Sequence, residues 1–128
     1  MGLFDKIKKG LKSAMAYAEM DDFLIKTIDK ILCEKWQKVS ERTPVNIGGV
    51  SLEEEAEYNF LYQYQGKTIQ VEMEHEFPLV EIEMQSGVTR YETKIQVSDF
   101  VVKDGTDFSI KNETDLRNIV AEMASMVE

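Results

Sequence analysis

Between Glu57 and Ile110, apolar and polar residues alternate with a period of two over several successive stretches of the chain. Side chains of a strand point to opposite faces at successive residues, so this alternation predicts strands with one buried and one polar face. The stretches are "EYNFLYQYQ", "TIQVEMEHE", "LVEIEMQ" and "TRYETKIQV", followed by the shorter pair "DFVVK" and "TDFSI". Turn signals separate them at Gly66-Lys67, Phe77-Pro78, Ser86-Gly87 and Asp104-Gly105. The region therefore predicts an antiparallel meander of four to six strands.

Helical spacing of apolar residues precedes this region. The pattern predicts a core helix over 21–39, with Asp21 or Asp22 as its N-cap. The apolar stripe of this helix consists of Leu24, Ile28, Ile31, Leu32, Trp36 and Val39. Residues 40–56 contain Pro44 and the pair Gly48-Gly49, so we interpret them as a linker.

A second helical pattern follows the sheet, over 112–128. Asn112 is the predicted N-cap, and Asp115 stands three residues later in a position that resembles a capping box. Its apolar stripe is Leu116, Ile119, Val120, Met123 and Val127. The chain thus predicts one α+β domain over 1–128: an N-terminal helix or helix pair, an antiparallel meander with one face covered by helices, and a C-terminal helix. This order of elements resembles small secretion chaperones and cystatin-like proteins in architecture, without a shared motif, and implies nothing about function.

The first twenty residues differ from the rest of the chain in charge. "MGLFDKIKKGLKSAMAYA" carries four lysines and one aspartate, a net charge of +3, whereas the whole chain carries −9. The segment predicts a basic amphipathic helix, either a separate arm or continuous with the core helix. Its apolar face could bind a partner, a membrane surface, its own domain or a second copy in a homo-oligomer. The residues expected to make this contact are Leu3, Phe4, Ile7, Lys8, Leu11 and Lys12.

Composition excludes several classes of function. A net charge of −9 argues against binding to nucleic acid. The single cysteine, Cys33, excludes a disulfide framework and multi-cysteine zinc sites, and we expect it to be a partly buried, inert thiol. No apolar run is long enough to cross a membrane, and lysines interrupt the N-terminus where a secretory signal needs an apolar core. A cytoplasmic location is therefore expected.

The stretch "VEMEHEFPLVEIEM", residues 71–84, holds five glutamates and the only histidine of the chain. The turn assignments above place His75 opposite Tyr58 on one neighbouring strand and opposite Val80 on the other. His75 should therefore lie on the apolar face and pack at the edge of the core. Because neighbouring strand residues point in opposite directions, "EHE" is not expected to converge on a metal ion.

The same registers place Glu72 opposite Glu83 and Glu74 opposite Glu81 on the polar face. Two interpretations of these four glutamates remain open. They could form a solvated face whose charge is balanced by Arg90 and Lys94 on the next strand, or an acidic surface that recruits a basic protein or a divalent cation.

No residue set predicts catalysis or a dedicated metal or cofactor site. The aromatic row from Tyr58 to Tyr64 is interpreted as core packing, because a base-stacking platform would need basic residues beside it. The sequence therefore favours a non-enzymatic protein-interaction module, chaperone- or immunity-like, that binds a basic partner through Glu72, Glu74, Glu81 and Glu83 or through the N-terminal helix. The alternative is a peripheral membrane adaptor anchored by that helix.

Overall fold

The structure is a computed structural model that describes residues 19–43, 46–47, 50–51, 57–76 and 78–128. The basic N-terminal segment, with the six residues expected to contact a partner or a membrane, lies outside the described residues. Gly48-Gly49 of the predicted linker also lies outside them.

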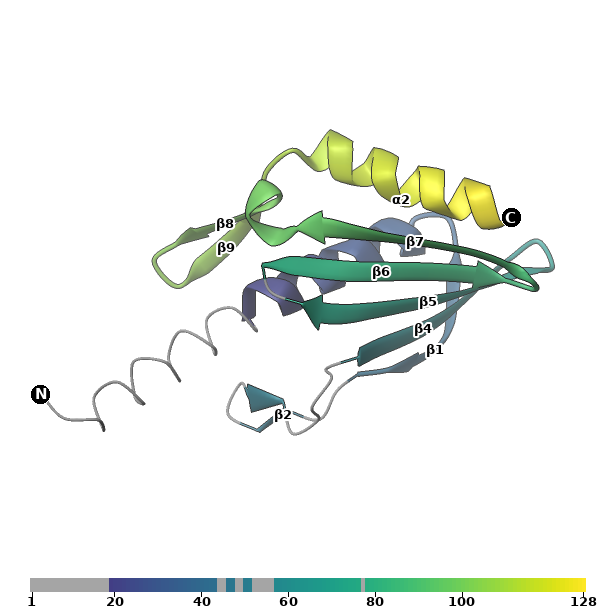
Figure 1. The fold of residues 1–128 in the computed structure, drawn as a ribbon, viewed down its shortest axis with the longest axis horizontal. Coiled ribbons are helices and arrows are strands. Elements are labelled where there is room, and N and C mark those ends of the chain that lie inside the picture. The colour runs from purple at the N-terminus through teal and green to yellow at the C-terminus, as the bar shows by residue number, and fades with distance from the viewer. Residues whose placement is uncertain (1–18, 44–45, 48–49, 52–56, 77) are drawn as a thin grey trace, which may run out of the picture.

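A five-stranded antiparallel sheet with the order β1-β4-β5-β6-β7 forms the centre of the fold (Figure 1). Its strands are β1 (Gln37–Arg42), β4 (Glu57–Tyr64), β5 (Lys67–Glu76), β6 (Leu79–Ser86) and β7 (Thr89–Gln96). Two small hairpins accompany it, β2 (Asn46–Ile47) with β3 (Val50–Ser51) and β8 (Val101–Asp104) with β9 (Asp107–Ile110). The 3-10 turn η1 (Val97–Asp99) follows β7, and helix α2 (Glu113–Val127) closes the chain. The predicted α+β fold with an antiparallel meander is confirmed.

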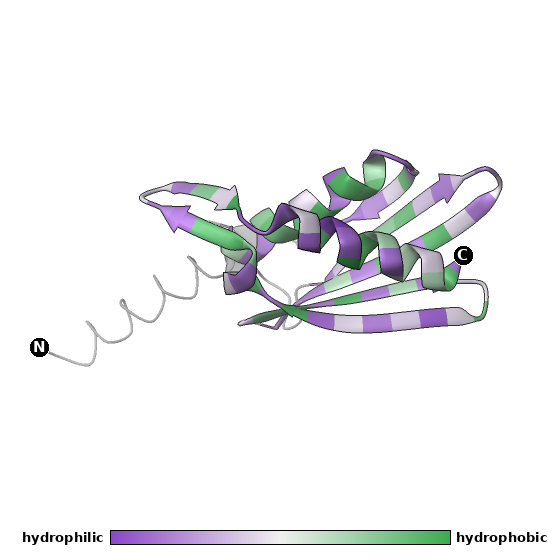
Figure 2. Cartoon of the chain, turned by 90° about the horizontal axis from the view of Figure 1, so that it is seen from above, coloured by the Kyte–Doolittle hydropathy of each residue, from purple (hydrophilic) through white to green (hydrophobic). Residues whose placement is uncertain are grey.

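One face of the sheet is buried beneath two helices, as the alternation predicts. The helix over 19–33, which we call the core helix, runs behind the sheet in Figure 1, and α2 lies along its β7 side. The colouring in Figure 2 shows apolar and polar residues alternating along the strands. The buried sheet residues are Tyr58, Phe60, Tyr62, Ile69, Val71, Met73, Val80, Ile82, Met84 and Ile95. The two helices add Leu24, Ile25, Ile28, Leu32, Leu116, Val120, Met123, Ala124 and Val127 to the same hydrophobic cluster.

The core helix ends at residue 33 and not at Val39 as predicted. The chain turns there, and the backbone N–H of Trp36 donates to the carbonyl of Leu32 at 2.8 Å. Trp36 is buried in this turn, whereas Val39 lies in β1 with 55% of its surface exposed. Residues of the predicted helix end and linker instead form β1, because pairing with the open side of β4 satisfies their backbone groups. Asp21 and Asp22 lie within the helix, which already includes residues 19–20, so neither is its N-cap.

The register between β5 and β6 is the predicted one, with His75 opposite Val80. The register between β4 and β5 is shifted by two residues, so that Tyr58 faces Met73 and not His75. The cause is the turn, which uses Gln65 and Gly66 with φ of 48° and 78° in place of Gly66-Lys67. Positive φ at both central residues is the geometry of a type I′ hairpin. A shift of two residues leaves every side chain on its predicted face.

Asn112 precedes α2 as predicted but does not cap it. Its backbone is left-handed, with φ of 54°, and its side chain makes no capping hydrogen bond. The side-chain amide instead donates to the carbonyl of Asp99 at 2.8 Å, which ties the start of α2 to η1.

Candidate functional site: the acidic sheet face

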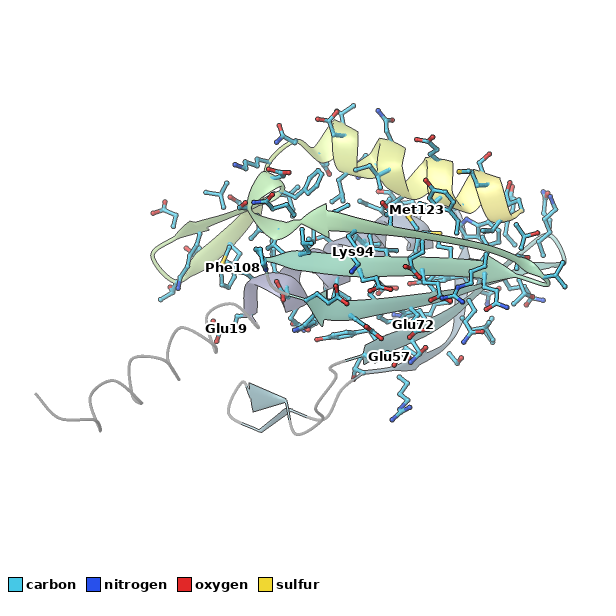
Figure 3. The ribbon with its side chains drawn as sticks, viewed as in Figure 1. Glu19, Glu57, Glu72, Lys94, Phe108 and Met123 are labelled. Carbon is cyan, nitrogen blue, oxygen red and sulfur yellow. The ribbon has the colours of Figure 1, made fainter. Side chains whose placement is uncertain are left out.

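The polar face of the sheet is lined by glutamates from four neighbouring strands. Figure 3 shows Glu57, Glu72 and Lys94 on the side of the sheet away from the core helix. We call this surface the acidic face and define it by Glu57, Glu72, Glu74, Glu76, Glu81, Glu83 and Glu92. All four glutamates predicted to bind a partner belong to it.

Glutamates stand directly opposite one another across this face. The predicted pairs Glu72–Glu83 and Glu74–Glu81 are confirmed by the register of β5 and β6. Two further pairs were not predicted: Glu57 faces Glu74, and Glu83 faces Glu92. Like charges in directly opposed positions destabilise a sheet by a few tenths to about 1 kcal/mol each. The fold therefore carries an electrostatic cost concentrated on one surface.

Cations offset this charge along the β7 side of the face. Arg90 Nε lies 2.8 Å from Glu83 Oε1, and Arg90 Nη2 lies 3.2 Å from Glu92. Lys94 Nζ lies 2.9 Å from Glu76 and 3.9 Å from Glu81. The prediction that Arg90 and Lys94 share the polar face is therefore confirmed.

Glu57 and Glu72 have carboxyl oxygens within 4.8 Å of one another on the β4 side of the face. The pKa of Glu72 is raised to about 7. The largest cause is a hydrogen bond between the protonated carboxyl of Glu72 and Glu57, and burial and nearby negative charge add to it. The same hydrogen bond is the largest cause that holds the pKa of Glu57 below its usual value, and Arg42 contributes to that shift. Near neutral pH Glu72 is therefore partly protonated, and a nearby cation would favour its ionised form.

Three groups of carboxylates on this face have oxygens within 4.8 Å of one another: Glu57 with Glu72 and Glu74, Glu74 with Glu76 and Glu81, and Glu81 with Glu83 and Glu92. Oxygen ligands suit hard divalent cations, but Ca²⁺ takes roughly six to eight of them. Three carboxylates on a sheet face would leave most of that shell to water. The arrangement therefore suits diffuse attraction of positive charge better than a dedicated cation site.

His75 lies on the opposite, apolar face, as predicted, at the end of β5. Its Nδ1 is 3.7 Å from Oδ2 of Asp21, and its ring stacks on that of Tyr58. Among the described residues, neither Nε2 of His75 nor Oδ1 of Asp21 has a hydrogen-bond partner, although both atoms are buried. Burial lowers the pKa of His75 and raises that of Asp21 to about 7. The contact of Asp21 with His75 was not predicted, because helical periodicity does not reveal which strand end a helix residue contacts.

Cys33 is exposed and not partly buried as predicted. Its thiol donates to Oδ1 of Asp29 at 3.6 Å. Desolvation and the negative charge of Asp29 raise the pKa of this thiol, which therefore stays protonated at neutral pH.

The aromatic row of β4 belongs to the core, which bears out its interpretation as packing. Tyr58 donates to Asp22, and Tyr62 donates to Asp29, each at 2.6 Å. Both hydroxyls therefore anchor the core helix to β4.

A cleft of about 380 Å³ separates the end of the core helix from α2. Its apolar floor includes Leu32, Trp36 and Val120. At its rim, ion pairs from Arg117 to Glu34 and from Lys35 to Glu128 join α2 and the residue after it to the turn that follows the core helix. Periodicity along the chain does not predict this cleft, because its walls come from segments more than eighty residues apart.

Comparisons with protein-family models, with curated proteins and with solved structures gave no significant match to this chain. Among the residues that the structure describes, no helix has both the length and the apolar character needed to cross a membrane.

Proposed function

We propose that the protein is a non-enzymatic interaction module of the cytoplasm that binds a basic protein partner through the acidic face. The observation that carries the proposal is the set of four directly opposed glutamate pairs, Glu57–Glu74, Glu72–Glu83, Glu74–Glu81 and Glu83–Glu92. Opposed like charges work against the stability of the sheet, Arg90 and Lys94 offset part of this cost, and a cationic partner would relieve the repulsion that remains. A chaperone- or immunity-like role, in which the acidic face masks a basic surface, is the specific form of this function.

The electrostatics also support a face that adapts to its partner. Because the pKa of Glu72 is raised to about 7, this carboxyl is only partly ionised at neutral pH. An arginine or lysine placed beside it would favour the ionised form and release a proton. Binding should therefore become tighter as the pH rises from 6 to 8 and weaker as the salt concentration rises.

The test is affinity purification with the full chain, followed by the same experiment with Glu72, Glu74, Glu81 and Glu83 all changed to glutamine. A partner identified with the native chain should be lost with this variant. The matched control changes Glu19, Asp104, Asp107 and Glu122 to their amides, which removes the same charge from exposed positions outside the acidic face. Equal recovery of the partner with both variants would refute the proposal.

A second candidate function rests on the N-terminal segment. Its charge of +3 and the apolar residues Leu3, Phe4, Ile7 and Leu11 suit a helix that lies on an anionic membrane surface, or one that self-associates. Co-sedimentation with anionic vesicles should then be lost in the variant Lys8→Glu with Lys12→Glu. Equal pelleting of the native and variant chains would remove the membrane function.

A further inference from the structure

The two edges of the five-stranded sheet differ in how they are protected. A register shift interrupts the pairing of β1 between Lys38 and Ser40, and its charged residues Glu41 and Arg42 are exposed. A bulge of this kind prevents an edge strand from pairing with another chain, whereas exposed charges occur on both β1 and β7. Strand β7 contains no bulge, proline or glycine, and it pairs with β6 over eight consecutive residues.

The outer backbone edge of β7 also has no strand paired to it in the described part of the chain, although α2 runs alongside this edge in Figure 1. Within the described part of the chain, β7 pairs with β6 alone and ends the sheet (Figure 1). Helix α2 packs against the inner face of the sheet, because its buried residues share one cluster with Ile95 of β7. Most of β7 is exposed, including Thr89, Arg90, Tyr91 and Glu92.

We propose that β7 pairs with β7 of a second copy of this chain, in antiparallel orientation, about a two-fold axis at Thr93. In this register, Glu92 of each copy stands opposite Lys94 of the other copy. The register also opposes Tyr91 to Ile95, and it pairs the strands over Arg90–Gln96. The two five-stranded sheets become one continuous sheet.

Charge complementarity favours this occupant. In one chain, Glu92 stands directly opposite Glu83, and Arg90 contacts both carboxylates. The second copy places Lys94 on the other side of Glu92, and the side chains of Glu92 and Lys94 are 44% and 47% exposed and within reach of a neighbour. The symmetry forms this ion pair twice, so the acidic face becomes less repulsive where the copies meet.

Exposed apolar residues lie along the same border. Tyr91 points to the inner face of β7 and is 36% exposed, and the paired strand brings Ile95 of the second copy opposite it. On α2, helical geometry places Ile119 and Met126 on the flank away from the core helix, and Met126 is 51% exposed. The two-fold axis brings this flank towards its counterpart in the second copy.

Neighbouring registers are less favourable. An axis at Glu92 would oppose Glu92 to itself and Arg90 to Lys94, and an axis at Lys94 would oppose two lysines. An axis at Tyr91 opposes unlike charges but pairs only Thr89–Thr93 within the strand. The register at Thr93 therefore combines unlike charges with the longest pairing.

The first test is sedimentation of the full chain over a range of concentrations, with the variant Glu92→Lys. The native chain should form a dimer, and the variant, which opposes lysine to Lys94 twice, should dissociate at a concentration about tenfold higher or more. The change removes the contact of Arg90 with Glu92, keeps Arg90 on Glu83 and adds a lysine opposite Glu83, so the unfolding temperature of the monomeric chain should change little. If Glu92 only stabilised the fold of the single chain, the variant would change the unfolding temperature together with the dissociation concentration.

Asp107→Lys on β9 is the matched control, because it changes the net charge equally at an exposed site away from β7. It should leave the dimer unchanged. The proposal would be overturned if the native chain were monomeric at all concentrations. Strand β7 would then be available to a strand of another protein.

The second test fixes the register by cross-linking in a Cys33→Ser background. Thr93→Cys places two thiols across the axis at a Cα separation of about 4.5–5.5 Å, within the range of a disulfide. A mild oxidant such as diamide should then yield a covalent dimer. Thr89→Cys is the control, because its two copies lie at opposite ends of the paired strands. Equal cross-linking at positions 93 and 89 would overturn the proposal. A dimer that persists in Glu92→Lys and is not cross-linked through Thr93→Cys would also overturn it, and would point to the N-terminal segment as the dimer contact.

Discussion

The ring of His75 stacks on the ring of Tyr58, with centroids 5.3 Å apart and planes 14° from parallel. Tyr58 in turn donates its hydroxyl proton to Asp22, and Asp21 lies beside His75. The only histidine of the chain is thus held between a strand and the core helix, in a cluster with two carboxylates. Because Asp21 is 1% exposed and has an unpartnered oxygen, this cluster makes the stability of the fold depend on pH.

Asp21→Asn should stabilise the fold at pH 8. Burial raises the pKa of Asp21 from 3.8 to about 7 in the folded chain, so the folded state binds the proton more tightly than the unfolded state. Stability from this group is present at pH 4 and is lost as the pH rises through 7. We expect the variant to unfold with a free energy higher by about 1 to 4 kcal/mol at pH 8, and with little difference at pH 4. Urea titrations at the two pH values measure this difference.

His75 acts in the opposite direction. Burial lowers its pKa in the folded chain, so the folded state resists protonation and loses stability as the pH falls below 6.5, the value of an unperturbed histidine. Asp21→Asn should therefore leave the decline in stability on the acid side of pH 6. If Asp21→Asn removed the pH dependence of stability equally below pH 6 and above pH 7, Asp21 and His75 would titrate as one pair.

Tyr62→Phe should lower the free energy of unfolding by about 1.5–3 kcal/mol, the usual range for a hydrogen bond to a charged group. The lost bond runs from the Tyr62 hydroxyl to Asp29 at 2.6 Å and holds the core helix to β4. Tyr64→Phe is the matched control, because no hydrogen bond joins its hydroxyl to a described residue. Equal losses in the two variants would show that the bond to Asp29 adds nothing.

Glu72→Gln and Glu76→Gln should change stability in opposite directions at pH 8. Glu72 has a raised pKa and faces Glu83, so removal of its charge should stabilise the sheet by a few tenths to about 1 kcal/mol. Glu76 accepts from Lys94, which holds its pKa below the usual value, so removal of its charge should destabilise the sheet. Thermal unfolding of both variants at pH 8 gives the two signs. A loss of stability in both would show that the acidic face is fully neutralised by its cations.

Gln65→Asn should stabilise the hairpin between β4 and β5. Gln65 has a φ of 48°, a conformation that asparagine adopts more readily than glutamine, and Gly66 follows with a φ of 78°. We expect a gain of a few tenths to about 1 kcal/mol in the free energy of unfolding. Gly66→Ala is the counterpart, and it should cost about 1 kcal/mol because alanine disfavours that φ. A stabilising effect of Gly66→Ala would contradict the type I′ geometry.

Alternation between Glu57 and Ser86 predicted the faces of three strands, because burial on one side leaves a clear period of two. Strand β1 was missed for the opposite reason: almost all of its residues are exposed, so its sequence carries no alternation. Trp36 and Val39 continued the helical stripe by coincidence of spacing. An apolar stripe indicates which residues are buried, but Trp36 is buried in a turn and not in a helix.

The acidic face was predicted only in part. Its central pairs follow from the turn at Pro78, which fixes the register of β5 and β6. The pairing of Glu57 with Glu74 was missed because the turn lies one residue earlier than predicted, which shifts the register of β4 and β5 by two residues. The contact of Asp21 with His75 joins a helix to a strand end, and no periodicity encodes where those two elements meet.

Strand β4 has a particular place in the order of folding. It pairs on one side with β5 through a two-residue turn, and β5, β6 and β7 follow by further short connections, so these strands can pair in sequence at low loop entropy. The core helix and β1 reach β4 only across the residues between 42 and 57, and they close the core together. Trp36, the only tryptophan of the chain, packs edge-on against Tyr64 of β4 at that junction, with ring centroids 5.7 Å apart. We therefore expect its fluorescence to change after the circular dichroism of the sheet has developed, which separates the final docking step in time.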